Sequence, residues 1–89
     1  MSTYIKDPNA VLDYKWDWSG WLAAGETITT STVTVPTGIT KDSATNTTTT
    51  ATVWLSGGTV DTGYIVTNRI VTNQGRTDDR SITIRLRNR

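Results

Sequence analysis

The sequence predicts a small all-β domain, and three observations support this fold class. Thr, Val, Ile, Tyr and Trp, which suit a pleated and half-buried surface, make up 41 of the 89 residues. Apolar and polar residues alternate over short segments, as they do in strands with one buried face. Turn signals recur roughly every eight to twelve residues. With a net charge of only +1, four Trp and three Tyr, the chain is expected to fold around a packed core.

The first residues are expected to form an extended arm. Pro8 disfavours a helix at the residue before it and belongs to a turn signal. We therefore divide the chain into an extended N-terminal arm at 1–9 and a single β-sandwich domain at 10–89. The arm has no apolar segment typical of a secretory signal, so synthesis in a cytoplasm is expected.

Residues 11–18 form the clearest predicted strand. Its two parities are apolar and charged, which is the pattern of a strand with one buried face and one wet face. A short turn of helix is expected next, because Ser19 can cap its start and Gly25 its end. Trp21 and Leu22 in this turn are expected to close one end of the core. The predicted buried face of the strand consists of Leu12, Tyr14, Trp16 and Trp18.

The next segment, 26–35, is Thr-rich and extended. Ile28 and Val33 lie on opposite parities, so one regular strand cannot bury both of them. We therefore predict a bulge near 31–32, where an extra residue would change the parity. A Pro-Thr-Gly turn follows this strand.

The second half of the chain predicts strands at 39–43, 47–56, 63–73 and 79–88. A polar turn at 42–46 separates the first two, a Gly-Gly pair ends the second, and an Asn-Gln-Gly-Arg hairpin turn precedes the last. The whole pattern gives six or seven strands with a short turn of helix. This is typical of an immunoglobulin-like or fibronectin-like β-sandwich, and a small barrel is the alternative.

Residue types that support catalysis are scarce. The chain has no His and no Cys, which excludes histidine bases, thiol nucleophiles, disulfides and metal sites built on those residues. Asp13 and Asp17 share a strand face, but Lys15 lies between them, which favours ion pairing over acid–base chemistry. We expect no catalytic residue, no metal and no other cofactor, and therefore a protein that is not an enzyme. We also expect no membrane segment, because no apolar run approaches the length of a membrane span.

Positive charge gathers toward the C-terminal end. Residues 1–68 have a net charge of −3, whereas residues 69–89 contain six Arg and two Asp. Arg85, Arg87 and Arg89 share one face of the last strand and can form a basic stripe. Such a stripe suits either contact with a partner or protection of an edge strand from aggregation. The balanced overall charge argues against a nucleic acid partner.

Trp54 is a second candidate for contact with a partner. Its parity places it opposite the apolar face of its strand, among threonines, where an exposed Trp can anchor a protein partner. A carbohydrate-binding module is the lower-ranked alternative, because clustered Trp can stack on sugars, but core packing accounts for Trp16 and Trp18. The candidate protein-interface residues are Trp54, Arg69, Arg76, Arg80, Arg85, Arg87 and Arg89.

Two stretches of the chain are distinctive in combination. They are KDPNAVLDYKWDWSGWL at 6–22 and ATVWLSGGTVDTGYIVTNRIVTNQGRT at 51–77, followed by DRSITIRLR. In this order they resemble a family of small tailed-bacteriophage and prophage virion proteins, often labelled fibre–tail adaptors. The similarity extends over about 6–87.

This resemblance implies an immunoglobulin-like structural module of a virion, made in the cytoplasm of the bacterial host and without a catalytic motif. Such a module would dock on head, neck, tail or fibre proteins in several symmetric copies. A capsid cement or decoration protein on the head lattice is the alternative role. Among the motif residues, Asn68 lies on an otherwise apolar strand face and is expected to tie down a loop through side-chain hydrogen bonds.

Overall fold

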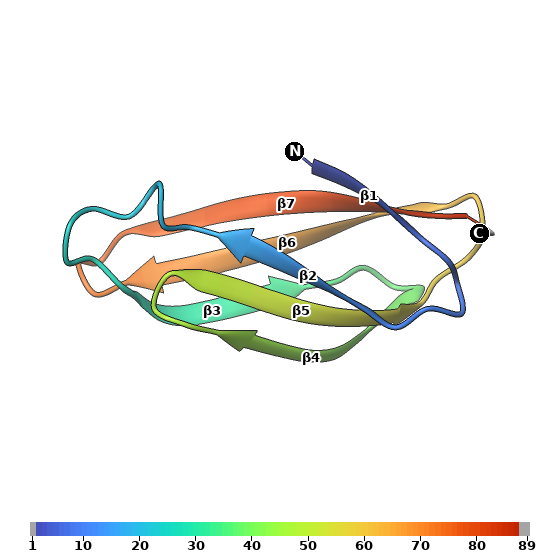
Figure 1. Cartoon of the computed structure of the whole chain (residues 1–89), viewed down its shortest axis with the longest axis horizontal. Helices are drawn as coiled ribbons and strands as arrows, with labels where there is room; N and C mark the ends of the chain where they lie inside the picture. Colours follow the sequence, from blue (N-terminus) through green and yellow to red (C-terminus); the bar gives the residue numbers. More distant parts are fainter. Residues whose placement is uncertain (1, 88–89) are drawn as a thin grey trace.

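The computed structural model describes residues 2–87, which form two β-sheets packed face to face (Figure 1). The seven strands are β1 (Ser2–Lys6), β2 (Leu12–Asp17), β3 (Ile28–Thr34), β4 (Ile39–Asn46), β5 (Thr50–Gly57), β6 (Gly63–Thr72) and β7 (Thr77–Leu86). One sheet has the strand order β1-β7-β6-β3 and the other β2-β5-β4. Neighbouring strands are antiparallel except for β1 and β7, which run parallel. The predicted all-β sandwich is confirmed.

The core lies between the sheets and is built from alternate residues of the strands. Burial alternates with exposure along β2, β5 and β6 and along the second half of β7, because successive side chains of a strand point to opposite faces. The predicted buried face of residues 11–18 is therefore confirmed, except that Leu12 at the start of β2 is 37% exposed. The buried apolar residues are Tyr14, Trp16, Trp18, Ile28, Val33, Ile39, Ala51, Val53, Leu55, Tyr64, Val66, Ile70, Ile82, Ile84 and Leu86.

β3 contains a bulge, but earlier than the sequence predicts. Its register against β6 shifts between Ile28 and Thr30, so the extra residue is Thr29 and not a residue near 31–32. The shift allows Ile28 and Val33 to face the core together despite their opposite parities. Thr29 Oγ1 donates a hydrogen bond to the carbonyl of Val71 in β6, which stabilises the bulge at this position.

β4 is longer than the sequence predicts. It runs through 42–46, so the predicted polar turn there is wrong, and the turn to β5 lies at 47–49. β4 is an edge strand bonded only to β5, and its residues 40–46 are exposed, which explains their polar character. The turn is held by Thr47, whose Oγ1 accepts from the N–H groups of Thr49 and Thr50.

The segment between β2 and β3 forms hydrogen-bonded turns and no helix, which corrects the expected short turn of helix. The N–H groups of Trp21 and Leu22 both donate to the carbonyl of Trp18, and Gly25 has a positive φ of 76°. Trp21 and Leu22 pack half-buried against this end of the core, as expected. No helix long and apolar enough to cross a membrane occurs within residues 2–87.

The segment expected to be an extended arm contributes β1. Residues 2–6 pair in parallel with 82–86 of β7. Met1, the first residue of the expected arm, lies outside the described residues. The division of the chain into an arm at 1–9 and a domain at 10–89 stays a prediction.

Lys6 fastens the end of β1 to the other sheet. Its side chain is fully buried, and Nζ donates to the carbonyl of Gly57 at 2.9 Å and to that of Asp7 at 3.0 Å. Burial lowers the pKa of Lys6, because a charged ammonium loses solvation inside the protein. The two carbonyls compensate part of that loss by accepting hydrogen bonds from the charged group.

Glycines form two of the turns that the sequence predicts. Gly57 and Gly58 at the end of β5 have φ angles of 75° and 100°, which L side chains rarely adopt. A Cβ on Gly58 would lie 2.7 Å from Cγ of Leu86, so the turn also packs too closely on β7 to admit a side chain. Gly75, with a φ of 81°, completes the predicted hairpin turn between β6 and β7.

A buried polar contact joins the two sheets. Asn68 of β6 and Trp18, which follows β2, are both fully buried, and Trp18 Nε1 donates to Asn68 Oδ1 at 2.8 Å. Asn68 Nδ2 donates to Ser31 Oγ and to the carbonyl of Thr32 in β3. The amide therefore has partners on both of its polar atoms, as a buried amide requires. The expected side-chain hydrogen bonds of Asn68 are confirmed, and they bind a neighbouring strand as well as the residue after β2.

Replacing Asn68 by alanine is expected to destabilise the fold by about 2–4 kcal/mol, because the N–H of Trp18 would stay buried without a partner. Urea unfolding followed by circular dichroism measures this change. Asn9→Ala, at an exposed position, is the control and is expected to change the free energy of unfolding by no more than about 0.5 kcal/mol. Equal losses in the two variants would contradict the role given to Asn68.

Candidate interaction surfaces

A buried carboxylate holds one end of the sandwich together. Glu26, which precedes β3, has a fully buried side chain that accepts hydrogen bonds from Thr72 Oγ1 at 2.6 Å and from the N–H of Ala23 at 2.9 Å. Arg76 binds both carboxylate oxygens, with its Nε 2.9 Å from Oε2. The guanidinium also lies 4.0 Å from the centre of the Trp21 ring. Arg76, a candidate interface residue, is thus engaged within the chain.

These contacts stabilise the charged form of the carboxylate. Hydrogen bonds from Arg76, from Thr72 and from the N–H of Ala23 lower the pKa of Glu26 from 4.5 to about 2. A carboxyl whose pKa is lower in the folded state contributes stability above its unfolded pKa. This contribution is lost as the pH falls toward the folded pKa.

Arg69 and Arg80 also have partners within the chain. Arg69, on the outer face of β6, binds Asp79 of β7 through two hydrogen bonds of 2.7 and 3.0 Å. Arg80 lies on the core side of β7, with its guanidinium 4.2 Å from the centre of the Trp18 ring. Arg80 Nη1 donates to the carbonyl of Asp17 at 3.0 Å. Both side chains therefore have defined positions in the isolated chain.

The far end of β7 carries the described part of the basic stripe. Arg85 and Arg87 are exposed, and Arg89 lies outside the described residues. Arg87 Nη1 lies 3.9 Å from Oδ1 of Asp61, and both of these side chains are more than half exposed. Such an exposed pair contributes little to folding, so both Arg side chains are available for contact with a partner.

Apolar side chains flank Arg85 on the outer face of the four-stranded sheet. Ile5 of β1 lies directly beside Arg85, and Ile65 of β6 lies beside Thr83, two positions earlier on β7. Ile5 is 50% exposed and Ile65 is 56% exposed. We call this surface the Arg85 face; it consists of Ile5, Ile65, Arg85 and Arg87.

The outer face of the three-stranded sheet carries Trp54, which is 42% exposed on the central strand β5. Asp13 of β2 lies opposite it on one side and Ser43 of β4 on the other. The exposure expected from its parity is confirmed. We call this surface the Trp54 face; it consists of Asp13, Ser43, Thr52 and Trp54.

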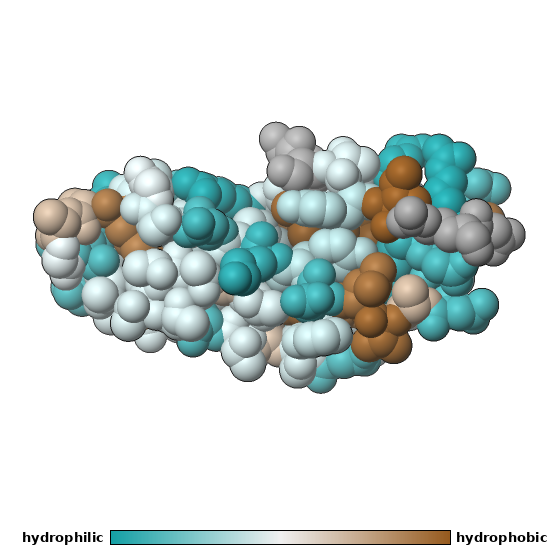
Figure 2. All heavy atoms as spheres, in the orientation of Figure 1, coloured by the Kyte–Doolittle hydropathy of each residue, from teal (hydrophilic) through white to brown (hydrophobic). Residues whose placement is uncertain are grey.

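Further apolar surface lies around the segment that joins β1 to β2. Figure 2 shows it where β1 leads into β2, whereas the middle of the same view is mostly polar or neutral. The exposed apolar residues along this part of the chain are Ile5, Val11 and Leu12. Two of these residues lie close in sequence to the Trp54 face, and Ile5 belongs to the Arg85 face.

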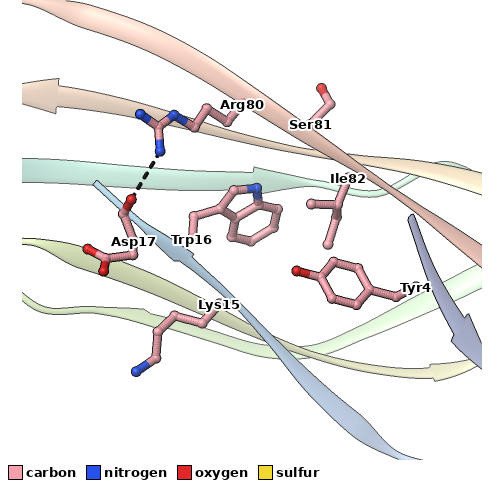
Figure 3. A pocket seen from close by; sticks show the side chains of 7 residues that line it. All are labelled: Tyr4, Lys15, Trp16, Asp17, Arg80, Ser81 and Ile82. Carbon is pink, nitrogen blue, oxygen red and sulfur yellow. Dashed lines mark hydrogen bonds between the residues drawn. The ribbon is translucent and has the colours of Figure 1, made fainter. Parts of the chain in front are cut away.

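A cleft of about 490 Å³ opens between the two sheets, at the edges formed by β2 and by β1 with β7 (Figure 3). Trp16 forms part of its wall, and Nε1 of this side chain is buried without a hydrogen-bond partner among the described residues. No sequence pattern singled out this cleft, because its walls come from three strands in two sheets. It is lined by Tyr4, Lys15, Trp16, Asp17, Arg80, Ser81 and Ile82.

The candidate residues thus do not form a single surface. Trp54 lies on one sheet, and Arg85 and Arg87 lie on the outer face of the other. Arg69 and Arg76 belong to ion pairs, and Arg80 caps a carbonyl. Within residues 2–87, no group of three or more potential acidic ligands lies close enough to hold a metal ion.

Glu26→Gln is expected to make the protein less stable at pH 7, because the neutral amide loses the ion pair with Arg76. The difference from the parent protein is expected to shrink as the pH falls from about 4.5 to about 2, where the parent carboxylate becomes protonated. Thermal unfolding over this pH range measures the effect. Asp79→Asn, in the exposed pair with Arg69, is the control and is expected to have a smaller effect. A difference that does not change with pH would contradict this account of Glu26.

Comparison with known proteins bears on the role of these surfaces. The chain matches one family over residues 6–85, which includes all of β2 to β6 and most of β7. No curated protein matched the chain. The family is described as podophage GP4 fiber-tail adaptor protein gp77, a structural component of phage particles, which agrees with the resemblance in the sequence. With the match covering most of its length, the chain belongs to this podophage fiber-tail adaptor family.

Proposed function

We propose that this protein joins a fibre protein to a tail protein in a podophage virion by binding both at the same time. Its family is one of fiber-tail adaptors. Its mechanism is protein binding and involves no catalytic step. It is made in the cytoplasm of the bacterial host and assembles in several symmetric copies.

The presence of an exposed anchor on each outer face of the sandwich is the observation that carries this proposal. The Trp54 face belongs to the β2-β5-β4 sheet and the Arg85 face to the β1-β7-β6-β3 sheet. The two outer faces of a sandwich point in opposite directions and are separated by its core. Two partners can therefore occupy them at once, as an adaptor requires.

The two faces suit partners of different chemistry. Trp54 is a large aromatic side chain surrounded by hydroxyl groups and a carboxylate, which matches an interface anchor with a polar rim. The Arg85 face combines two exposed Ile side chains with two Arg, which favours a partner that offers apolar groups and carboxylates. This difference allows each partner to recognise its own face.

Two variants test the assignment reciprocally. Trp54→Ala and the double variant Arg85→Glu/Arg87→Glu are each expected to weaken the binding of one partner about tenfold or more. Each variant is expected to leave the affinity for the other partner within about twofold, because the faces are separate. Titration calorimetry with the purified tail and fibre proteins measures the affinities, and circular dichroism shows that each variant is folded.

Each variant thus serves as the control for the other. If both variants weaken the same partner, or if neither weakens any partner, the two-face assignment is wrong.

The copy number in the particle tests the role independently. Quantitative mass spectrometry of purified particles, scaled to the portal protein, is expected to give about six to twelve copies or a small multiple of that number, in keeping with a symmetric tail. Hundreds of copies would show a decoration protein on the head lattice instead. Absence from the particle would contradict a virion role altogether.

A further inference from the structure

The cleft between the sheets lies where part of a strand is missing from the four-stranded sheet. β1 pairs with β7 only over 82–86, whereas β7 begins at Thr77. On that side of β7, none of the described residues forms a strand beside 77–81. The cleft opens at the end of this unpaired stretch, where Ser81 and Ile82 line it (Figure 3). Among residues 2–87, no strand thus covers this edge of β7 beside the cleft.

The backbone of β7 is oriented to bond an added strand at Ser81. The N–H of Arg87 donates to the carbonyl of Lys6 in β1, so the backbone groups of odd-numbered residues of β7 point to this side. The N–H of Asp79 already donates to the carboxylate of Asp78 at 2.9 Å. The N–H of Ser81 points to the same side, so Ser81 is the position where an incoming strand would meet a backbone donor beside the cleft.

The wall of the cleft contains a buried side-chain donor that has no partner among residues 2–87. Trp16 is 4% exposed, and its Nε1 has no acceptor among residues 2–87. In Figure 3, the indole nitrogen lies on the side of the ring toward the β7 residues. A buried N–H without a partner costs free energy that an acceptor would recover. Trp18, on the same strand face, has such an acceptor in Asn68.

Arg80, at the rim of the cleft, forms no ion pair with the part of the chain that the structure describes. No carboxylate oxygen of the described residues lies within 4.0 Å of a guanidinium nitrogen of Arg80, in contrast to Arg69 and Arg76. Lys15 and Asp17 also line the cleft, but in Figure 3 the charged ends of both side chains point away from Trp16, so the charge that the cleft offers beside the indole is that of Arg80. A carboxylate is the acceptor that would pair with Arg80 and accept from an indole N–H.

We infer that this cleft binds an extended acidic segment of a partner protein, which adds as a strand to β7 beyond β1 and places a carboxylate against Trp16 and Arg80. This inference rests on the proposed function, because the segment would belong to one of the two proteins that the adaptor joins. Side chains at the rim must shift for the carboxylate to reach the buried Nε1, as interface side chains commonly do on binding.

Two substitutions test separately the indole N–H of Trp16 and the positive charge of Arg80. Trp16→Phe removes the indole N–H and keeps an aromatic ring, and Arg80→Gln removes the positive charge. Each is expected to weaken the binding of one partner about tenfold or more, as measured by titration calorimetry with the purified tail and fibre proteins. Lys41→Gln, on the edge strand β4 of the other sheet, is the matched control, because Lys41 also donates to a backbone carbonyl; this variant is expected to bind like the parent protein. Thermal unfolding shows which variants are folded.

Hydrogen exchange tests the inference on the unaltered protein. Within 77–82, the amides of Thr77 and Ser81 are expected to exchange about tenfold or more slowly in the complex with that partner, because they point to the side on which the strand would add, whereas the even-numbered amides face β6. Amides of 28–34 in β3, the other edge of the same sheet, are the control and are expected to keep their rates. This measurement remains decisive if Trp16→Phe does not fold.

The outcomes separate the two proposals. If the parent protein binds neither the tail nor the fibre protein, both proposals are overturned. If it binds, but the exchange of 77–82 and the affinities of both cleft variants are unchanged, only the cleft inference is overturned. Slower exchange of 77–82 on raising the concentration of this chain alone would identify a second copy as the occupant, which also overturns it.

Discussion

The hydrogen bond between Trp18 and Asn68 fixes how the two sheets lie on one another. Apolar contacts fill the core without specifying a unique alignment, whereas a buried amide requires particular partners in particular places. Asn68 in β6 binds Trp18 from the opposite sheet and Ser31 in the neighbouring strand. Trp18 in turn supports Arg80 on the face of its ring and makes a T-shaped contact with the ring of Trp21. The closed end of the sandwich and the rim of the cleft both depend on this one contact.

The central strands can be predicted from the sequence because burial of one face leaves a period of two. This signal disappears in β4, where residues 40–46 are all exposed, so nothing in the pattern separates strand from turn. For β3, the opposite parities of Ile28 and Val33 require a bulge between them. Its position at Thr29 depends on a contact with Val71, which is 42 residues away, so local sequence cannot place it.

Among the candidate interaction residues, too, some features can be predicted from the local sequence and others cannot. The exposure of Trp54 follows from parity alone. The roles of the Arg side chains do not, since Arg76 meets Glu26 across 50 residues and Arg80 meets the carbonyl of Asp17 across 63. Charge by itself therefore cannot separate these internal contacts from the exposed Arg85. The sequence likewise cannot predict that the indole N–H of Trp18 has a hydrogen-bond acceptor whereas that of Trp16 has none among residues 2–87, because the acceptor comes from a distant strand.

The parallel pairing of β1 with β7 has a mechanical consequence. Ser2 lies opposite Ile82 and Lys6 lies opposite Leu86, so the start of β1 and the end of β7 are at opposite ends of the paired segment. A force that pulls these two points apart acts along both strands and strains all of their shared backbone hydrogen bonds together. In a hairpin pulled open at its ends, by contrast, the bonds break one after another. The buried ammonium of Lys6 adds resistance to sliding, because it would have to leave the carbonyl of Gly57. The β1–β7 pair is thus arranged to resist a force applied between the start of β1 and the end of β7.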